Sequence, residues 1–318
     1  MVSLLGATGP DRALRGASQG RRRQRAAPRG DRVRGDGRGR PRGRGGGPES
    51  RPLAGRRKRI GGSLREGRVS LVNLKLVGVV ILLAVLPTLR PAVDIHPEYV
   101  KFVSGHDTLT AYLAYPERKD RAPAVVVIHE VFGLSDFIRQ TTEQLARDGF
   151  VAVAPDLLSR RGGTPPSPDD ARKLIATLNP DTVTQDLDAT VAYVKRLKAA
   201  RPDRVGVIGF CWGGGQSFRY ATNNPSLRAF VVCYGPGPDA MAIARLRAAG
   251  LGVYAENDAR INSGLTDVDA AVRTYHKKYR YDVYPGVGHG FFRTREKPEV
   301  ADSAWKAVVG FFRANLER

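Results

Sequence analysis

Residues 205–223 read VGVIGFCWGGGQSFRYATN, and this stretch decides the fold. The apolar run at 205–208 predicts a buried strand, and 212–223 is expected to form a helix. Between them the motif Gly209-Phe210-Cys211-Trp212-Gly213 places a thiol between two glycines, which allow a sharp turn. A thiol at a helix N-terminus meets free N–H groups and the helix dipole, and both favour the thiolate. The alternative is a glycine-rich turn around a buried structural cysteine. A phosphate-binding loop is excluded because no Gly-Lys-Ser/Thr follows.

Strands and helices alternate on both sides of this turn. We expect further strands at 100–103, 109–115, 124–128, 150–154, 229–233, 251–255 and 281–284. We expect further helices at 135–148, 169–177, 181–199, 263–278 and 299–316. The run Ala-Val-Val-Val-Ile at 124–128 is typical of a strand buried on both faces of a parallel sheet. The pattern predicts an α/β fold over residues 94–318, with a mostly parallel, doubly wound sheet flanked by helices.

Two further polar residues follow expected strands. Asp258 comes just after 251–255, and His289 lies between two glycines after 281–284. Catalytic groups of open α/β sheets collect at the carboxyl ends of the strands. Nucleophile, acid and histidine in this chain order, with the nucleophile on a glycine-flanked elbow, is the arrangement of α/β-hydrolases. We therefore predict Cys211 as nucleophile, Asp258 as orienting acid and His289 as general base, with Asp282 as a weaker rival for the acid.

The segment His129-Glu130-Val131-Phe132-Gly133 follows the strand at 124–128. It is not an H-E-x-x-H zinc motif, because residue 133 is glycine. None of the five histidines pairs at a metal-ligand spacing, so we expect no metal and no cofactor. In an elbow fold this loop supplies one backbone N–H to the oxyanion hole, and the residue after the nucleophile, Trp212, supplies the other.

Five short motifs resemble the dienelactone hydrolase family, the carboxymethylenebutenolidases of the α/β-hydrolase superfamily. They are H-E-V-F-G-L at 129–134, A-P-D-L at 154–157, G-F-C-W-G-G at 209–214, N-D at 257–258 and H-G-F at 289–291. The resemblance covers roughly residues 95–316. It implies an α/β-hydrolase fold and a cysteine hydrolase that opens enol-lactones.

The resemblance also implies roles for individual residues. Cys211, His289 and Asp258 take the three roles given above, and Glu130 matches a glutamate that contacts the nucleophile and helps to activate it. The backbone N–H groups of Val131 and Trp212 correspond to the oxyanion hole. Three side chains are expected to bind the substrate: Arg293, Phe132 and Arg172. Arg293 matches an arginine that binds the substrate carboxylate in the family. The sequence departs from the family at Ala255-Glu256-Asn257-Asp258, where the family often begins with glycine, and at the Arg- and Gly-rich loop 159–168.

The N-terminal fifth has a different composition. Residues 1–70 carry 20 Lys and Arg against 5 Asp and Glu, so most of the net charge of +21 lies there. This Arg/Gly/Pro-rich segment has too few apolar residues to offset its ordering entropy, and we predict a disordered tail. Alternative interpretations are a tail that binds nucleic acid or anionic lipid by charge, or a translation start nearer Val69. No aromatic residue is interleaved for base stacking.

An apolar run, LVGVVILLAVL, follows Lys75 at 76–86. Basic residues before a short apolar core predict a signal peptide over 71–92, and 71–89 is long enough for an uncleaved membrane anchor. The alternative is a buried helix of the main domain. We therefore expect an exported or membrane-anchored protein, and a cytoplasmic one if this segment is not a signal.

These observations predict a hydrolase that cleaves an enol-lactone or an activated carboxylic ester through an acyl-enzyme. A broader exported carboxylesterase and a non-catalytic binding protein on a hydrolase fold are the alternatives. The expected partner is a small ester or lactone, with no nucleic acid for the folded domain, membrane contact only through 71–89, and a monomeric state. Two cysteines exclude a disulfide-dense scaffold, and we predict Cys233 to be a buried, reduced core residue.

Overall fold

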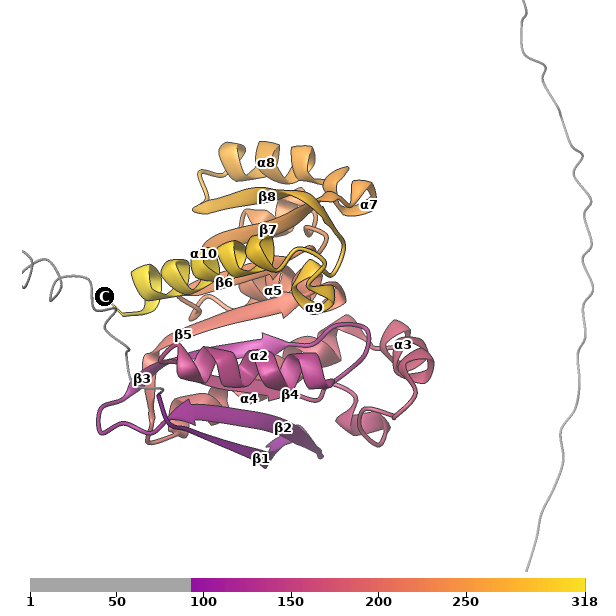
Figure 1. The fold of residues 1–318 in the computed structure, drawn as a ribbon. Helices are drawn as coiled ribbons and strands as arrows, with labels where there is room; N and C mark the ends of the chain where they lie inside the picture. The colour runs from indigo at the N-terminus through magenta and orange to yellow at the C-terminus, as the bar shows by residue number, and fades with distance from the viewer. Residues whose placement is uncertain (1–92, 318) are drawn as a thin grey trace, which may run out of the picture. The chain divides into compact units, whose positions relative to one another are not determined.

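The strands on both sides of the Cys211 turn form one eight-stranded sheet in the computed structural model, which describes residues 93–317 (Figure 1). The strands are β1 (Ile95–Ser104), β2 (Asp107–Pro116), β3 (Ala122–Ile128), β4 (Val151–Pro155), β5 (Ala200–Phe210), β6 (Ala229–Cys233), β7 (Ala249–Asn257) and β8 (Tyr279–Gly288). The helices are α2 (Asp136–Arg147), η1 (Ser159–Arg161), α3 (Pro168–Ala176), α4 (Pro180–Arg196), α5 (Trp212–Asn223), α6 (Ala240–Ile243), α7 (Ala259–Asn262), α8 (Leu265–Thr274), α9 (Phe291–Thr294) and α10 (Pro298–Leu316).

The sheet is mostly parallel, as predicted. Its order is β1-β2-β4-β3-β5-β6-β7-β8, with β2 antiparallel to both β1 and β4 and all other neighbours parallel. Every residue of β3, β4 and β6 is buried, which explains their continuous apolar sequences. The carboxyl ends of β3, β5, β7 and β8 consequently lie along one edge of the sheet.

Two apolar cores lie on the two faces of the sheet. Successive residues of β3 alternate between them, with Val126 in one core and Val125 and Val127 in the other. Helices α4, α5 and α8 cover the first face, and α2 and α10 cover the second (Figure 1). This confirms the doubly wound arrangement. Among residues 93–317, no helix combines the length and apolar character that a membrane crossing requires.

The structure differs from the sequence-based expectations near the carboxyl end of β7. The helix expected at 263–278 is the shorter helix α8, and Ser263 and Gly264 separate it from the short helix α7 that precedes it. The strand expected at 281–284 extends over the whole of β8. The short helices α6, α7, α9 and η1 were not predicted, because three or four residues are too few to show a helical period. The predictions for 1–70 and 71–92 lie outside the described residues.

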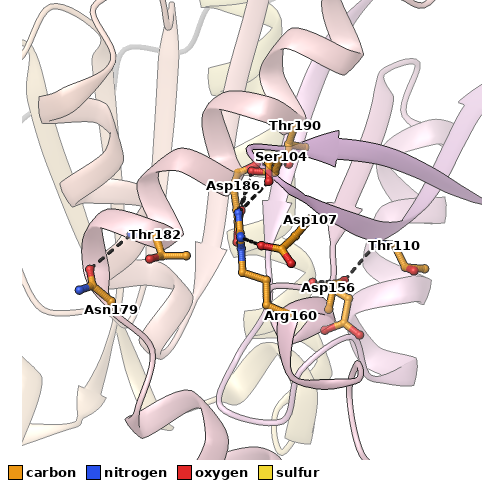
Figure 2. Close-up of polar contacts among 10 residues, drawn as sticks. Ser104, Asp107, Thr110, Asp156, Arg160, Asn179, Thr182, Asp186 and Thr190 are labelled. Atoms are coloured by element: carbon orange, nitrogen blue, oxygen red, sulfur yellow. Dashed lines mark hydrogen bonds and ion pairs between the residues drawn. The ribbon is translucent and has the colours of Figure 1, made fainter. Parts of the chain in front are cut away.

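The Arg- and Gly-rich segment after β4 is anchored by Arg160. Figure 2 shows the Arg160 guanidinium group between Asp186 of α4 and Asp107, the first residue of β2. The Arg160 Nη2 atom lies 2.8 Å from Asp186 Oδ1, and the same oxygen accepts a 2.7 Å hydrogen bond from the Ser104 hydroxyl. The Asp186 side chain is only 2% exposed, so this ion pair is shielded from water. The segment that leads into α3 is therefore fixed to the sheet.

A second group of hydrogen bonds ties this segment to the loop after β3. The Thr164 N–H and hydroxyl donate to the Asp156 carboxylate at 2.7 and 2.9 Å. The Thr164 hydroxyl in turn accepts the Leu134 N–H at 2.8 Å. The loop after β3 and the segment before α3 are thus held together. Between them, the loop and α3 carry four residues that the sequence assigned to the site: Glu130, Val131, Phe132 and Arg172.

Candidate active site

Cys211 occupies a strained turn between β5 and α5. Its backbone has φ 57° and ψ −117°, a positive φ that non-glycine residues rarely adopt. The turn is held by a 3.0 Å hydrogen bond from the Cys211 N–H to the carbonyl oxygen of Cys233. A Cβ at Gly213 would collide with the carbonyl oxygens of Ile128 and His129, and a Cβ at Gly209 would collide with the Gly213 carbonyl. Both glycines are therefore required by backbone that approaches closely at the turn.

Three side chains from three strand ends form a hydrogen-bonded chain. His289, after β8, has Nε2 3.0 Å from Cys211 Sγ and Nδ1 2.5 Å from Oδ2 of Asp258, which follows β7. Asp258 is 7% exposed, so its carboxylate faces the imidazole and not solvent. The rival acid, Asp282, lies on β8 and pairs with Arg280 at 2.9 Å. The structure therefore brings together the predicted nucleophile, base and acid. Asp282 takes no part in these hydrogen bonds.

The environment of His289 favours its protonated form. The hydrogen bond with Cys211 is the largest cause that raises the pKa of His289, and the hydrogen bond with Asp258 adds to it, whereas burial opposes both. An imidazolium facing the sulfur stabilises a thiolate by charge and by hydrogen bonding. The three hydrogen-bonded side chains can thus hold a sulfur nucleophile beside an imidazole, His289, that can donate and accept a proton.

Glu130 is buried beside the chain and pairs with Arg293. It is 2% exposed, and Arg293 Nε lies 3.2 Å from its Oε1. Burial raises the pKa of Glu130, while the Arg293 charge opposes that shift. Among residues 93–317 the hydrogen-bond partner of the Glu130 carboxylate is Arg293, whereas the hydrogen-bond partner of Cys211 Sγ is His289. The part in thiolate activation that the sequence suggested for Glu130 stays a prediction.

The three residues assigned to substrate binding lie together, with both arginines against the Phe132 ring. The guanidinium carbon of Arg293, from α9, lies 5.0 Å from the centre of the Phe132 ring, and that of Arg172, from α3, lies 5.4 Å from it. Their side chains are 40% and 57% exposed. Arg293 pairs with Glu130 and Arg172 pairs with Asp169. Both guanidinium groups nevertheless stay exposed enough to attract a further anion. The arrangement therefore suits a negatively charged group at the mouth of the site.

Tyr234 belongs to this site and was missed by the sequence analysis. Its ring packs edge-on against the His289 ring, with the centres 5.0 Å apart. Its backbone φ is 40°, and its buried hydroxyl has no hydrogen-bond partner among residues 93–317. The only sequence signal was its place at the end of β6, beside the elbow strand, where an apolar core residue is the ordinary interpretation.

Cys233 shows how differently the two thiols are placed. It is fully buried at the end of β6, neither cysteine forms a disulfide, and burial raises the pKa of the Cys233 thiol. Cys211 is only half-buried. Within residues 93–317, no group of three or more His, Cys, Asp or Glu side chains is arranged to hold a metal ion.

Iodoacetamide at pH 7 is therefore expected to label one thiol per native chain and two after unfolding in guanidinium chloride. The burial of Cys233 is the reason for the difference, because alkylation needs an accessible thiolate. Intact-mass measurement counts the adducts, and peptide mapping assigns the native one to Cys211. Labelling of Cys233 in the native protein, or of neither thiol, would contradict this placement.

Comparison with known proteins agrees with the site geometry. A family model described as the dienelactone hydrolase family matches residues 109–316. A Synechocystis protein provisionally named carboxymethylenebutenolidase is 31% identical over 245 residues, which cover 71% of this chain and 99% of the relative. A Bradyrhizobium protein provisionally named 2-oxo-3-(5-oxofuran-2-ylidene)propanoate lactonase is 30% identical and covers 69% of this chain and 94% of its own length. A solved Klebsiella pneumoniae structure, provisionally assigned as a dienelactone hydrolase, has 28% identity and a TM-score of 0.64 over 69% of this chain and 98% of its own. This chain therefore belongs to the dienelactone hydrolase family and is a hydrolase of lactones or esters.

Proposed function

We propose that the enzyme opens an enol-lactone that carries a carboxylate, with Cys211 as the nucleophile. The observation that carries the proposal is the chain Cys211 Sγ···His289···Asp258, at 3.0 and 2.5 Å, on a strained elbow. A thiol hydrogen-bonded to a histidine that is itself oriented by a buried carboxylate has the arrangement of an activated nucleophile.

The reaction proceeds through a thioester. The Cys211 thiolate attacks the lactone carbonyl carbon, and the oxyanion is held by the Val131 and Trp212 N–H groups. The tetrahedral intermediate then collapses: the bond between the acyl carbon and the lactone ring oxygen breaks, and the His289 imidazolium donates its proton to the departing enolate oxygen. His289, now neutral, takes a proton from water as the water attacks the thioester. Expulsion of the Cys211 thiolate releases the acid and restores the imidazolium.

The thiolate nucleophile limits the substrates. A thiolate is itself a good leaving group, so the tetrahedral intermediate expels whichever group leaves more easily. An enolate or phenolate departs forward and leaves a thioester, whereas an amide nitrogen returns the thiolate unless it is first protonated. Enol-lactones and activated esters are therefore the substrates expected to turn over.

The two arginines over Phe132 favour a substrate with a carboxylate. Arg293 and Arg172 place two exposed guanidinium groups beside Phe132, and each can form a charge-assisted hydrogen bond with a substrate carboxylate. The substrate in the name of the Bradyrhizobium relative is a propanoate joined to an oxofuranylidene ring, which is an unsaturated lactone with a carboxylate. This chemistry agrees with the charge arrangement around Phe132.

The function is tested with the full chain on a carboxylated dienelactone and on p-nitrophenyl acetate, before and after iodoacetamide treatment. Loss of dienelactone turnover on alkylation supports the proposal. Ester turnover without dienelactone turnover favours a broader carboxylesterase. Dienelactone turnover that survives complete alkylation of Cys211 excludes the thiol mechanism.

The carboxylate preference is expected to depend on both arginines. Arg172→Ala and Arg293→Ala should lower kcat/KM for the carboxylated lactone about 10- to 100-fold, the range expected for loss of a charge-assisted contact. Arg172→Ala should leave p-nitrophenyl acetate turnover nearly unchanged, because Arg172 forms no ion pair with Glu130. Arg295→Ala is the matched control, since this neighbouring arginine pairs with Asp302. Equal losses on neutral and carboxylated substrates would argue against a carboxylate contact.

A further inference from the structure

We propose that His129 is a positioning residue that fixes the oxyanion hole, by holding the peptide of Val131 and the ring of Trp212 in place. The inference deepens the proposed function, and it rests on that function for the role of the oxyanion hole. The sequence analysis assigned His129 no role of its own: it excluded a zinc motif and was the first residue of the family motif at 129–134.

The hydrogen bonds of His129 determine which ring nitrogen carries the proton. The Leu157 N–H donates to His129 Nε2 at 3.2 Å, so Nε2 is unprotonated. Nδ1 therefore carries the proton and donates to the carbonyl oxygen of Glu130 at 2.8 Å. Because the ring is fully buried, a neutral imidazole in this one tautomer satisfies both contacts.

The hydrogen bond to Glu130 acts on the peptide that contains the Val131 N–H. In a trans peptide the C=O and the N–H of one plane point in opposite directions. Holding the Glu130 carbonyl toward His129 therefore turns the Val131 N–H away from His129. The same carbonyl accepts the Gly133 N–H at 3.3 Å, so the peptide is held from two sides. We find no hydrogen bond from the Val131 N–H to another residue in 93–317, which leaves that donor free for an oxyanion.

His129 also contacts the residue that provides the second N–H. Its ring stacks on the Trp212 ring, with centres 5.7 Å apart and planes inclined by 20°. The start of α5 is pressed against the backbone of the His129 loop, because a Cβ on Gly213 would collide with the His129 carbonyl. One buried ring thus contacts both halves of the oxyanion hole, whereas the Cys211 sulfur is hydrogen-bonded to the other site histidine, His289.

The test compares His129→Phe with His129→Asn in the full chain, using p-nitrophenyl acetate. Both variants leave the Leu157 N–H without its acceptor. Phenylalanine keeps a ring against Trp212 but has no donor, whereas the asparagine Nδ2 replaces Nδ1 as a donor to Glu130. We expect His129→Phe to lower kcat about 10- to 100-fold, somewhat less than outright loss of an oxyanion donor. His129→Asn is expected to recover most of that loss.

Alkylation separates positioning from general damage. Iodoacetamide reacts at a methylene carbon and forms no oxyanion, so its rate at Cys211 should be nearly the same in wild type and His129→Phe. Val308→Ala is the control for lost stability. It opens a cavity under α10, far along the sequence from the His129 loop, and this variant should keep the wild-type kcat. An unchanged kcat in His129→Phe, or equal falls in hydrolysis and alkylation, would overturn the inference. Failure of the proposed function instead appears as dienelactone inactivity or as turnover by alkylated wild type.

Nitrogen NMR gives a readout independent of activity. In ¹⁵N-histidine-labelled wild type, the signal absent from His129→Phe identifies His129 among the five histidines. We expect a protonated Nδ1 and an unprotonated Nε2 at pH 7. The opposite tautomer, or a doubly protonated ring, would contradict the hydrogen bonds on which the inference rests.

Discussion

Replacing Cys211 with alanine is expected to lower the turnover of activated esters and of the dienelactone by at least about 10⁴-fold, as for removal of a nucleophile in other hydrolases. In the proposed mechanism the Cys211 sulfur forms the covalent bond to the acyl group. Glu130 is ion-paired with Arg293 and His289 transfers protons, so no other residue described in the site is expected to take its place. Release of p-nitrophenolate and loss of the dienelactone chromophore measure the change. A remaining rate within about 100-fold of wild type would remove Cys211 from the mechanism.

The matched control is Cys233→Ala. This thiol is fully buried in the next strand and lies outside the chain to His289, so its loss should leave turnover close to wild type. Treating the Cys211→Ala preparation with iodoacetamide distinguishes true residual activity from contaminating wild type, because only the contaminant is inactivated. Comparing the two variants thus separates the loss of the catalytic thiol from the general effect of replacing a cysteine with alanine.

The sequence was sufficient for the parts of the site that depend on local turns. Glycines at 209 and 213 are required by backbone contacts within the turn itself, and such contacts impose a spacing that is visible in the sequence. Asp258 and His289 could be predicted for a related reason. Each directly follows a strand of a parallel sheet, so the strand pattern alone places both at the same edge.

The contacts that were missed join segments far apart in the chain. Glu130 and Arg293 are separated by 163 residues, and no local pattern specifies which cation reaches that buried carboxylate. The place of Arg172 over Phe132 depends on the segment before α3, which is anchored through Arg160 and Asp186. Tyr234 packs against His289 only because β6 ends beside the elbow. Such pairings are set by packing and not by the period of a helix or strand.

The choice between Asp258 and Asp282 shows the same limit, and it gives the second large expected effect. Asp258→Asn is expected to lower kcat/KM about 10³- to 10⁴-fold, the scale seen when an asparagine replaces the orienting acid of a histidine. An asparagine amide can donate to His289 Nδ1, which moves the proton to Nε2 and removes the base that faces Cys211 and water. Loss of the carboxylate also removes one cause that raises the pKa of His289, so the imidazolium is lost at a lower pH as pH rises.

Asp282→Asn tests whether position, and not carboxylate chemistry alone, accounts for this effect. Asp282 is exposed and pairs with Arg280, at 2.9 Å on the same strand, and exposed pairs contribute little to stability. Its substitution should leave kcat/KM nearly unchanged, while the Asp258 variant stays folded but slow. A large loss in the Asp282 variant, or a small one in the Asp258 variant, would mean that the 2.5 Å contact with His289 does not orient the base. The two substitutions change the same chemical group, so their difference isolates the contribution of the hydrogen-bonded chain.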